Sequence, residues 1–262
     1  MRWQSLAQAA ISQGVAVARL PFPARPGLRI LTYHTVGQAA YGDSLNLNTI
    51  SVEKFKTHVE VLSAVRTRSI EGAPTSDSGL EVAITFDDGY SDNLHVVAPL
   101  LASRNIPFTV FVTAGFVQKK LPGFLSPAEL LELSALPGVT IGAHGFTHCD
   151  LTTCSSAQLI EELTGSKNYI ENLIGRKVTS MAYPYGSVNA RVKQAVQDNG
   201  YTLATSSHFD VNKPGRDPLL MCRTVVLSPD TARVLKQKIR GDWDWYRWRT
   251  ADPQLLINNQ SI

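Results

Sequence analysis

Two adjacent carboxylates at the end of an apolar run are the residues of this sequence best suited to chemistry. Val82, Ile84 and Phe86 recur at every second position, a spacing typical of a β-strand. The run then stops at Asp87 and Asp88. Burying two acids beside a strand is costly unless a cation or a reaction uses them. The stretch therefore predicts the rim of an active site.

Two histidines with a spacing found among metal ligands follow later in the chain. His144 and His148 are four residues apart, so both imidazoles can face one ion from a helical turn or a tight loop. Asp87 or Asp88 would supply a third ligand. Two histidines and one carboxylate leave coordination positions open, which is typical of a catalytic metal rather than a structural one. The pattern predicts one divalent metal ion, with zinc as first choice and cobalt, nickel or iron as alternatives.

These residues need a scaffold, and strand-like and helix-like segments alternate along the chain. The predicted strands cover residues 28–34, 82–86, 108–113, 139–144, 178–183, 201–206 and 222–227. The predicted helices cover residues 52–65, 93–103, 127–136, 157–173, 190–199 and 230–239. This alternation predicts an α/β fold with about seven parallel strands in a barrel. In such barrels the chemistry lies where the strands end, and most of the histidines and the two acids fall there.

The overall composition fits one enzyme-sized domain and excludes several classes of protein. The chain has 262 residues, of which 44% are hydrophobic, enough for a sizeable core. A net charge of +3 without a long basic run gives no reason to expect a nucleic-acid partner. Three cysteines without a C-x-x-C pair predict buried free thiols rather than a disulfide framework or a cysteine zinc site.

The sequence divides into three regions. We expect an N-terminal helix and proline-rich linker over 1–27, the barrel over 28–241, and an aromatic tail over 242–262. The tail is predicted to pack on the barrel, with sugar or lipid headgroup contact as an alternative. Neither a signal peptide nor a membrane-spanning stretch is expected. We therefore expect a cytoplasmic protein, with peripheral contact at the inner membrane surface as an option.

At this point the residues match a known family. Thr85–Tyr90 (TFDDGY), the pair His144 and His148, and Tyr183–Gly186 (YPYG) occur in an order and spacing that resemble the polysaccharide deacetylase (NodB homology) family. The segment Tyr33–Val36 (YHTV) resembles the bacterial exopolysaccharide-type branch. The resemblance runs from about residue 28 to about residue 241. It implies a distorted (β/α) barrel, in agreement with the seven predicted strands.

The resemblance also implies an activity and roles for individual residues. The activity is metal-dependent hydrolysis of an N-acetyl group, in some members an N-formyl or O-acetyl group, on a sugar. Asp87 is implied as the general base, and the implied metal ligands are Asp88, His144 and His148. Tyr185 is implied to hold the oxyanion with its backbone N–H.

Two departures from the family pattern concern the partners of the base. Many members carry an arginine before the Pro-Tyr pair to orient the base, and this chain does not. We hypothesise that Arg223 supplies that charge, with a salt bridge at the rim as the alternative. The last predicted strand lacks the histidine that serves as general acid, so His208 is the candidate acid. His34 and Pro184, together with Tyr185, are candidate substrate contacts; a buried core histidine is the alternative for His34.

The sequence thus predicts a hydrolase of carbon–nitrogen bonds other than peptide bonds. It would remove an N-acetyl or N-formyl group from an amino sugar of a surface polysaccharide or its lipid-linked precursor. One alternative is a carbohydrate-binding protein on an inactive deacetylase fold, and another is a C–N hydrolase of a non-sugar amide. The expected partner is a carbohydrate or lipid-linked sugar, and the oligomeric state stays open.

Overall fold

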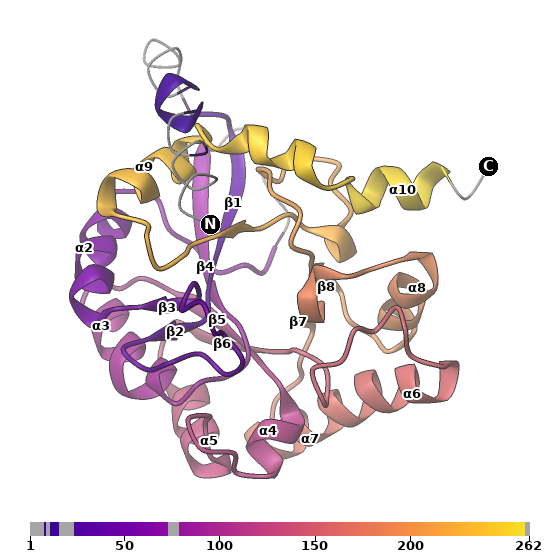
Figure 1. Cartoon of the computed structure of the whole chain (residues 1–262). Helices are drawn as coiled ribbons and strands as arrows, with labels where there is room; N and C mark the ends of the chain where they lie inside the picture. The colour runs from indigo at the N-terminus through magenta and orange to yellow at the C-terminus, as the bar shows by residue number, and fades with distance from the viewer. Residues whose placement is uncertain (1–7, 9–10, 16–23, 73–78, 260–262) are drawn as a thin grey trace.

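The structure of the chain, a computed structural model, describes residues 8, 11–15, 24–72 and 79–259 (Figure 1). Most of the predicted N-terminal helix lies outside these residues, although residues 8 and 11–15 are helical. Ser12 is buried and accepts a hydrogen bond from the Trp245 indole at 3.0 Å, so this short helical piece packs against the tail. Among the described residues, no helix is long and apolar enough to cross a lipid bilayer.

One parallel sheet of seven strands forms the centre of the described molecule, in the order β8-β7-β6-β5-β4-β1-β9. The strands are β1 (Gly27–Tyr33), β4 (Leu80–Phe86), β5 (Phe108–Val112), β6 (Val139–Ala143), β7 (Ser180–Ala182), β8 (Leu203–Thr205) and β9 (Thr224–Val225). Each of them overlaps one predicted strand. The predicted α/β fold with seven parallel strands is therefore confirmed.

A short stretch before and within β9 joins the two edges of this sheet. Met221 forms a parallel bridge with Thr205 of β8, and its N–H donates to the Ala204 carbonyl at 2.9 Å. Three residues later, Thr224 pairs with Leu31 of β1. Because one stretch is bonded to both edges, the sheet closes into a barrel. Strands of only two or three residues at this closure account for its distortion.

Helices surround the barrel, as Figure 1 shows. The main ones are α2 (Val52–Ser63), α3 (Ala98–Ala102), α4 (Ala114–Gln118), α5 (Pro127–Ala135), α6 (Ser156–Ile160), α7 (Ser166–Ile174), α8 (Ala190–Asp198), α9 (Ala232–Arg240) and α10 (Pro253–Asn259). Side-chain caps define the starts of several of them: Ser51 accepts from Lys54 N–H, and Ser126 forms a reciprocal capping box with Glu129. Gly175, at φ 68°, ends α7 in the left-handed conformation that glycine adopts readily.

Shorter elements complete the fold, and several of them were not predicted. They are the two-stranded sheet of β2 (Thr35–Val36) and β3 (Thr49–Ile50), the π-helical turns η1 (Asn93–Val97) and η2 (Glu161–Gly165), and the 3₁₀ turns η3 (Pro184–Gly186), η4 (Pro218–Leu220) and η5 (Asp244–Arg249). The predicted helix over 157–173 is therefore interrupted by η2. Residues 37–48 join β2 to β3, and α4 and α10 are additional helices.

Alternation along the strands separates two hydrophobic layers. On β1, Leu28 and Ile30 face the barrel interior, whereas Leu31 and Tyr33 belong to the larger core that packs against the helices. Thr32 continues the interior face and lines the cleft at its open end. The interior of the barrel thus changes from apolar to polar toward the carboxyl ends of the strands.

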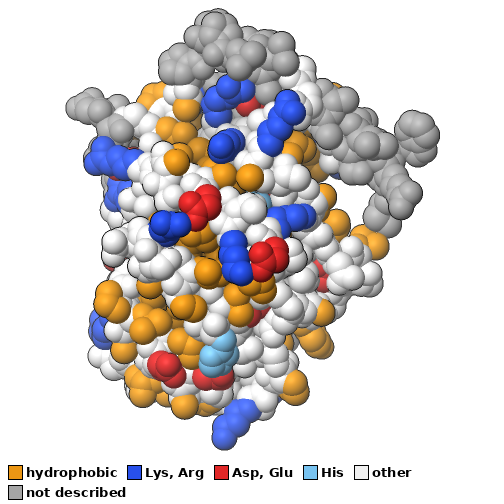
Figure 2. Space-filling view, turned by 90° about the vertical axis from the view of Figure 1, so that its left-hand side faces the viewer, with side chains coloured by type: hydrophobic (Ala, Val, Ile, Leu, Met, Phe, Trp, Pro, Cys, Tyr) orange, Lys and Arg blue, Asp and Glu red, His pale blue; other side chains and the backbone are white. Residues whose placement is uncertain are grey.

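The cysteines partly contradict the prediction of buried thiols. All three are free, and Cys222 is buried, but Cys149 and Cys154 are only half-buried. Their sulfur atoms lie 3.2 Å apart in the loop after His148. The surface charge agrees with the composition: on the face that carries α2 and α9, acidic and basic side chains lie interspersed (Figure 2).

Candidate active site

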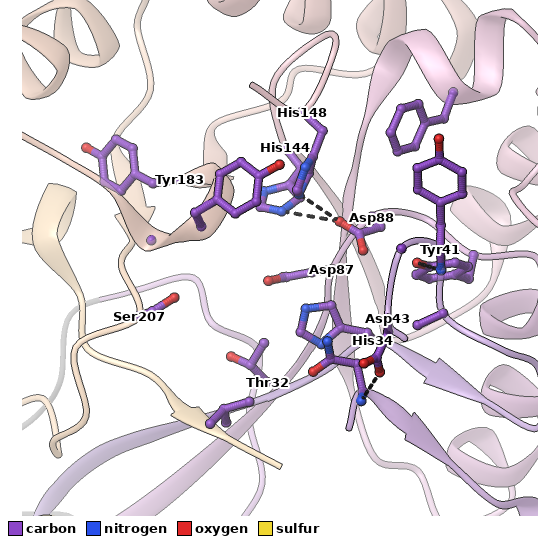
Figure 3. A pocket seen from close by; sticks show the side chains of 18 of the residues that line it. Thr32, His34, Tyr41, Asp43, Asp87, Asp88, His144, His148, Tyr183 and Ser207 are labelled. Carbon is purple, nitrogen blue, oxygen red and sulfur yellow. Dashed lines mark hydrogen bonds and ion pairs between the residues drawn. The ribbon is translucent and has the colours of Figure 1, made fainter. Parts of the chain in front are cut away.

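A cleft of about 690 Å³ opens at the carboxyl ends of the strands. The predicted residues that line it include His34, Asp87, Asp88, His144, His148, Tyr185 and Arg223. Figure 3 shows Asp88 directed toward the two histidines, and Asp87 lying between that group and His34. Strands β1, β4 and β6 each end at one or more of these residues, and Arg223 directly precedes β9, so the barrel register brings them together.

The adjacent acids diverge because of the backbone at the end of β4. Asp87 lies in the same alternation as Ala83, which is part of the barrel interior. Its N–H still donates to the Tyr33 carbonyl at 3.0 Å, as an extension of the β1–β4 pairing. Asp88 then has φ 73° and Gly89 φ 83°. This left-handed turn sends the Asp88 carboxylate away from that of Asp87.

Asp88, His144 and His148 form a group whose ligand atoms all lie within 4.8 Å of one another. The Asp88 Oδ1 atom is 3.5 Å from His144 Nε2 and 3.2 Å from His148 Nε2. That oxygen is buried, and within the described residues no donor has hydrogen-bond geometry toward it. One carboxylate oxygen and two imidazole nitrogens converging on a small space are a donor set that fits a divalent metal ion.

Hydrogen bonding and burial prepare these groups for a ligand role. The Ala182 carbonyl lies 2.8 Å from His144 Nδ1, so the proton is on Nδ1 and the lone pair is on Nε2. Burial lowers the pKa of His144, which favours the neutral ring that a metal requires. Burial alone would raise the pKa of Asp88, but the imidazoles of His148, His34 and His144 lower it below its usual range. The carboxylate is therefore ionised.

Asp87 is paired with an arginine that directly precedes β9, two strands along the sheet from β4. Arg223 Nη1 donates to Asp87 Oδ1 at 2.7 Å, and both side chains are almost fully buried. The guanidinium is held by a second bond, from Nε to the Ser206 carbonyl at 3.0 Å. Burial alone would raise the pKa of Asp87, but Arg223 and the nearby His144 and His34 lower it. The structure thus places Arg223 where it can orient this carboxylate.

His34 and Tyr185 lie on either side of this group. His34 follows β1, and its buried Nδ1 has no hydrogen-bond partner among the described residues. Tyr185 has φ 60°, and its ring is 66% exposed and lies 4.8 Å from the His148 ring. Three of the six non-glycine residues with positive φ in the described chain are Asp88, His148 and Tyr185. Such backbone strain is concentrated at functional sites in proteins.

Two predicted site residues do not line the cleft. His208 is buried beside the C-terminal segment, where its Nδ1 lies 3.2 Å from Thr250 Oγ1 and its Nε2 lies 4.0 Å from Asp252. Burial lowers its pKa. Pro184 is buried and packs near Gly145, behind the turn that carries Tyr185. The structure therefore does not bring His208 or Pro184 together with Asp87.

One wall of the cleft comes from residues that the sequence patterns did not single out. Tyr41, Asp43 and Asn48 belong to the loop between β2 and β3. The Tyr41 N–H donates to the Tyr90 hydroxyl at 2.8 Å, and Asp43 accepts from the Asn48 N–H at 2.6 Å. In the sequence this loop shows only a polar, turn-rich composition. No residue in it has a spacing that predicts chemistry, so only the fold identifies it as part of the site.

Comparisons with known proteins agree with this geometry. Residues 76–204 match the family described as polysaccharide deacetylase. YxkH of Bacillus subtilis, a polysaccharide deacetylase by its name, is 28% identical over 188 residues, which cover 69% of this chain and 64% of YxkH. Chitin deacetylase 1 of Cryptococcus neoformans is 27% identical over 138 residues, 49% of this chain and 28% of that protein. The chain thus spans less than two thirds of these relatives.

A further relative and one solved structure extend the comparison. The peptidoglycan-N-acetylglucosamine deacetylase PgdA of Listeria monocytogenes is 29% identical over 124 residues, 47% of this chain and 25% of that protein. The Streptococcus pyogenes deacetylase PplD, solved in complex with acetate, superposes with a TM-score of 0.72 at 21% identity. That superposition covers 82% of this chain and 99% of PplD, and it shows that the two share a fold. With the family match and the strand-end site, the chain belongs to the polysaccharide deacetylase family.

Proposed function

We propose that the protein is a metal-dependent hydrolase that removes an N-acetyl or N-formyl group from an amino sugar. The observation that carries this proposal is the pairing of two differently placed acids. Asp87 is held by Arg223 and lies beside a separate group of Asp88, His144 and His148. A base next to a metal site is an arrangement that can activate water for the hydrolysis of an amide.

The proposed mechanism assigns each residue one task. A divalent cation held by Asp88, His144 and His148 would supply Lewis-acid activation of the acyl carbonyl and of water. Asp87, kept ionised by Arg223, accepts the proton of the attacking water. The Tyr185 N–H donates a hydrogen bond to the carbonyl oxygen as negative charge develops there. The carbon–nitrogen bond then breaks, and the amine nitrogen needs a proton.

We assign that proton donor to His34 in place of His208. His34 lines the cleft, interacts electrostatically with both acids and has a buried nitrogen without a hydrogen-bond partner in the described chain. His208 lies outside the cleft and contacts Thr250. For His34→Gln, which removes the titratable proton but keeps a polar side chain, we expect kcat to fall by about 10²- to 10⁴-fold. If kcat of His34→Gln is unchanged at saturating metal, the proton donor is a group other than His34.

The walls of the cleft support a sugar as substrate. Tyr41 is 74% exposed on the wall built by the β2–β3 loop, and Tyr185 is 66% exposed on the turn after β7. Exposed aromatic rings at a cleft provide apolar faces on which sugar rings can stack. Two named relatives act on chitin and on peptidoglycan N-acetylglucosamine. We therefore propose an amino sugar of a surface polysaccharide, or of its lipid-linked precursor, in the exopolysaccharide-type branch of the family.

Acetate release from N-acetylated oligosaccharides of glucosamine, with Zn²⁺ or Co²⁺ added, tests the proposal. O-acetylated xylan and a simple N-acetyl amide serve as parallel substrates. Asp87→Asn should abolish turnover while the protein still binds the metal, whereas His144→Ala should lose the metal. Glycan binding without release of acetate would instead support a carbohydrate-binding protein on an inactive fold. Release from the simple amide alone would support a non-sugar C–N hydrolase.

The place of action is a separate proposal. We propose a cytoplasmic location, with peripheral contact at the inner membrane surface. Fractionation of cells that express the full natural chain tests it, because the soluble, membrane and exported fractions can be assayed separately for the protein.

A further inference from the structure

A buried carboxylate outside the cleft accepts hydrogen bonds from the loop between the two histidines. Glu162 is 7% exposed, and its Oε2 accepts from the N–H groups of Phe146 at 2.7 Å and Thr147 at 2.9 Å. Its Oε1 accepts from the Thr147 hydroxyl at 2.5 Å and from the Thr147 N–H at 3.2 Å. Charge-assisted bonds of this kind are about twice as strong as neutral ones.

The loop that Glu162 holds has a conformation that needs support. Gly145 has φ 73° and His148 has φ 63°, so the two histidines are joined by a non-helical loop. A non-glycine residue in the left-handed region is unfavourable unless its surroundings hold it there. On one side, the Gly115 N–H at the start of α4 donates to the Phe146 carbonyl at 2.8 Å. Glu162 holds the other side.

The helix that carries Glu162 is irregular at this position. Glu161–Gly165 form the π-helical turn η2 between α6 and α7, and such turns occur frequently at functional sites. Gly165, in the same turn, faces the Phe146 ring, where an added Cβ would lie 3.4 Å from the ring. The turn thus brings both the carboxylate and a small residue against the loop.

We propose that Glu162 is a positioning residue for the metal site. By fixing residues 146 and 147, it sets the direction in which His148 presents its Nε2 to Asp88 and His144. This inference rests on the proposed metal site. Glu162 would contact neither the metal nor the substrate, and it would still affect the affinity of the site for the ion. Loss of such supporting contacts typically weakens metal binding by about 10- to 100-fold.

The test is the affinity of full-length protein for Zn²⁺, measured by competition with a chelator in the absence of substrate. The absorption spectrum of the Co²⁺ form is recorded in parallel. Glu162→Gln keeps the size of the side chain but replaces one acceptor oxygen with an N–H₂ group. We expect its Kd for Zn²⁺ to rise by about 10- to 100-fold and the Co²⁺ bands to shift. The matched control Glu161→Gln, at the exposed neighbouring position, should leave both unchanged.

Thr147→Val provides a second measurement if Glu162→Gln does not fold. It removes only the hydroxyl donor, so the expected loss of Zn²⁺ affinity is smaller, below about 10-fold. If a folded Glu162→Gln protein keeps the wild-type Zn²⁺ affinity and Co²⁺ spectrum, the role of Glu162 is overturned. If Glu162→Gln does not fold, the same result in Thr147→Val overturns it. Wild-type protein that binds Zn²⁺ but releases no acetate would overturn the proposed hydrolase alone. Wild-type protein that binds no metal would overturn both.

Discussion

At the scale of single residues, the two neighbouring acids differ in what surrounds them. Asp88 faces two imidazoles across a space suited to a cation, and Asp87 faces the guanidinium of Arg223. Their carboxylates are chemically the same, so the division of labour comes from their partners. The pair 223 and 87 is separated by 136 residues in the chain. The assignment of Asp87 as the proposed base therefore depends on a contact between distant segments.

Removing the arginine should change the pH dependence of the reaction. Arg223 lowers the pKa of Asp87 against the effect of burial, so Arg223→Met should raise that pKa. The base acts only when ionised, and the acid limb of the kcat/KM profile should therefore move to higher pH. Arg223→Lys keeps the charge and should restore part of the original profile. An acid limb that stays in place in Arg223→Met would contradict an orienting role for Arg223.

At the scale of elements, loops and turns connect the site to the barrel through buried charges. Asp92, after the Asp-Asp-Gly turn, accepts hydrogen bonds from the Val36 N–H of β2 at 2.9 Å and from the Asn93 amide at 2.8 Å. It thereby anchors the small sheet from which the cleft wall extends. Burial nevertheless raises the pKa of Asp92 to about 7.

Asp92 should make the protein less stable as the pH rises. An acid whose pKa is higher in the folded chain binds its proton more tightly there. Its contribution is thus most favourable at low pH and is lost between about pH 4 and pH 7. Asp92→Asn removes this titration, so the variant should gain stability relative to wild type as pH increases, by at most about 4 kcal/mol. Urea unfolding at pH 5, 6, 7 and 8 measures the difference; a constant difference would refute the prediction.

A buried ion pair connects the tail to β1. Arg29 is fully buried and donates to both oxygens of Asp244 in η5, at 2.8 and 3.1 Å. Asp244→Asn would leave a buried guanidinium without its counter-charge, which costs about 3–5 kcal/mol. Glu53→Gln breaks the exposed pair with Lys56 and should cost less than about 0.5 kcal/mol. Chemical denaturation measures the free energy of unfolding of both variants. Equal losses of stability in the two variants would contradict the structural role of the tail.

At the scale of the whole molecule, the proposed metal site exists only when the barrel is formed. Asp88 follows β4, whereas His144 follows β6, and β5 separates these strands in the sheet. Zn²⁺ should therefore stabilise the folded state, by about 2.7 kcal/mol at a free concentration of 100 times its Kd. Chelator treatment should lower the melting temperature, and added Zn²⁺ should restore it. His144→Ala should show no response; an equal shift in this variant would place the stabilising ion elsewhere.

Local patterns in the sequence are enough to predict the alternating strands and helices, the strand-end acids and the histidine pair. These signals depend on periodicity and on spacings of a few residues. The backbone geometry of strands, helices and turns determines which of these residues share a face. The same signals also carry the resemblance to the deacetylase family. The approximate ranges of all seven strands follow from the same information.

The partners of the proposed catalytic residues are decided by tertiary structure. Arg223 reaches Asp87 because the stretch 221–225 closes the barrel between β8 and β1. His208 contacts Thr250 of the C-terminal segment and does not line the cleft. The cleft wall with Tyr41 and the support from Glu162 likewise depend on packing between segments far apart in the chain. Such contacts are set by strand register and side-chain packing, for which short sequence patterns contain no signal.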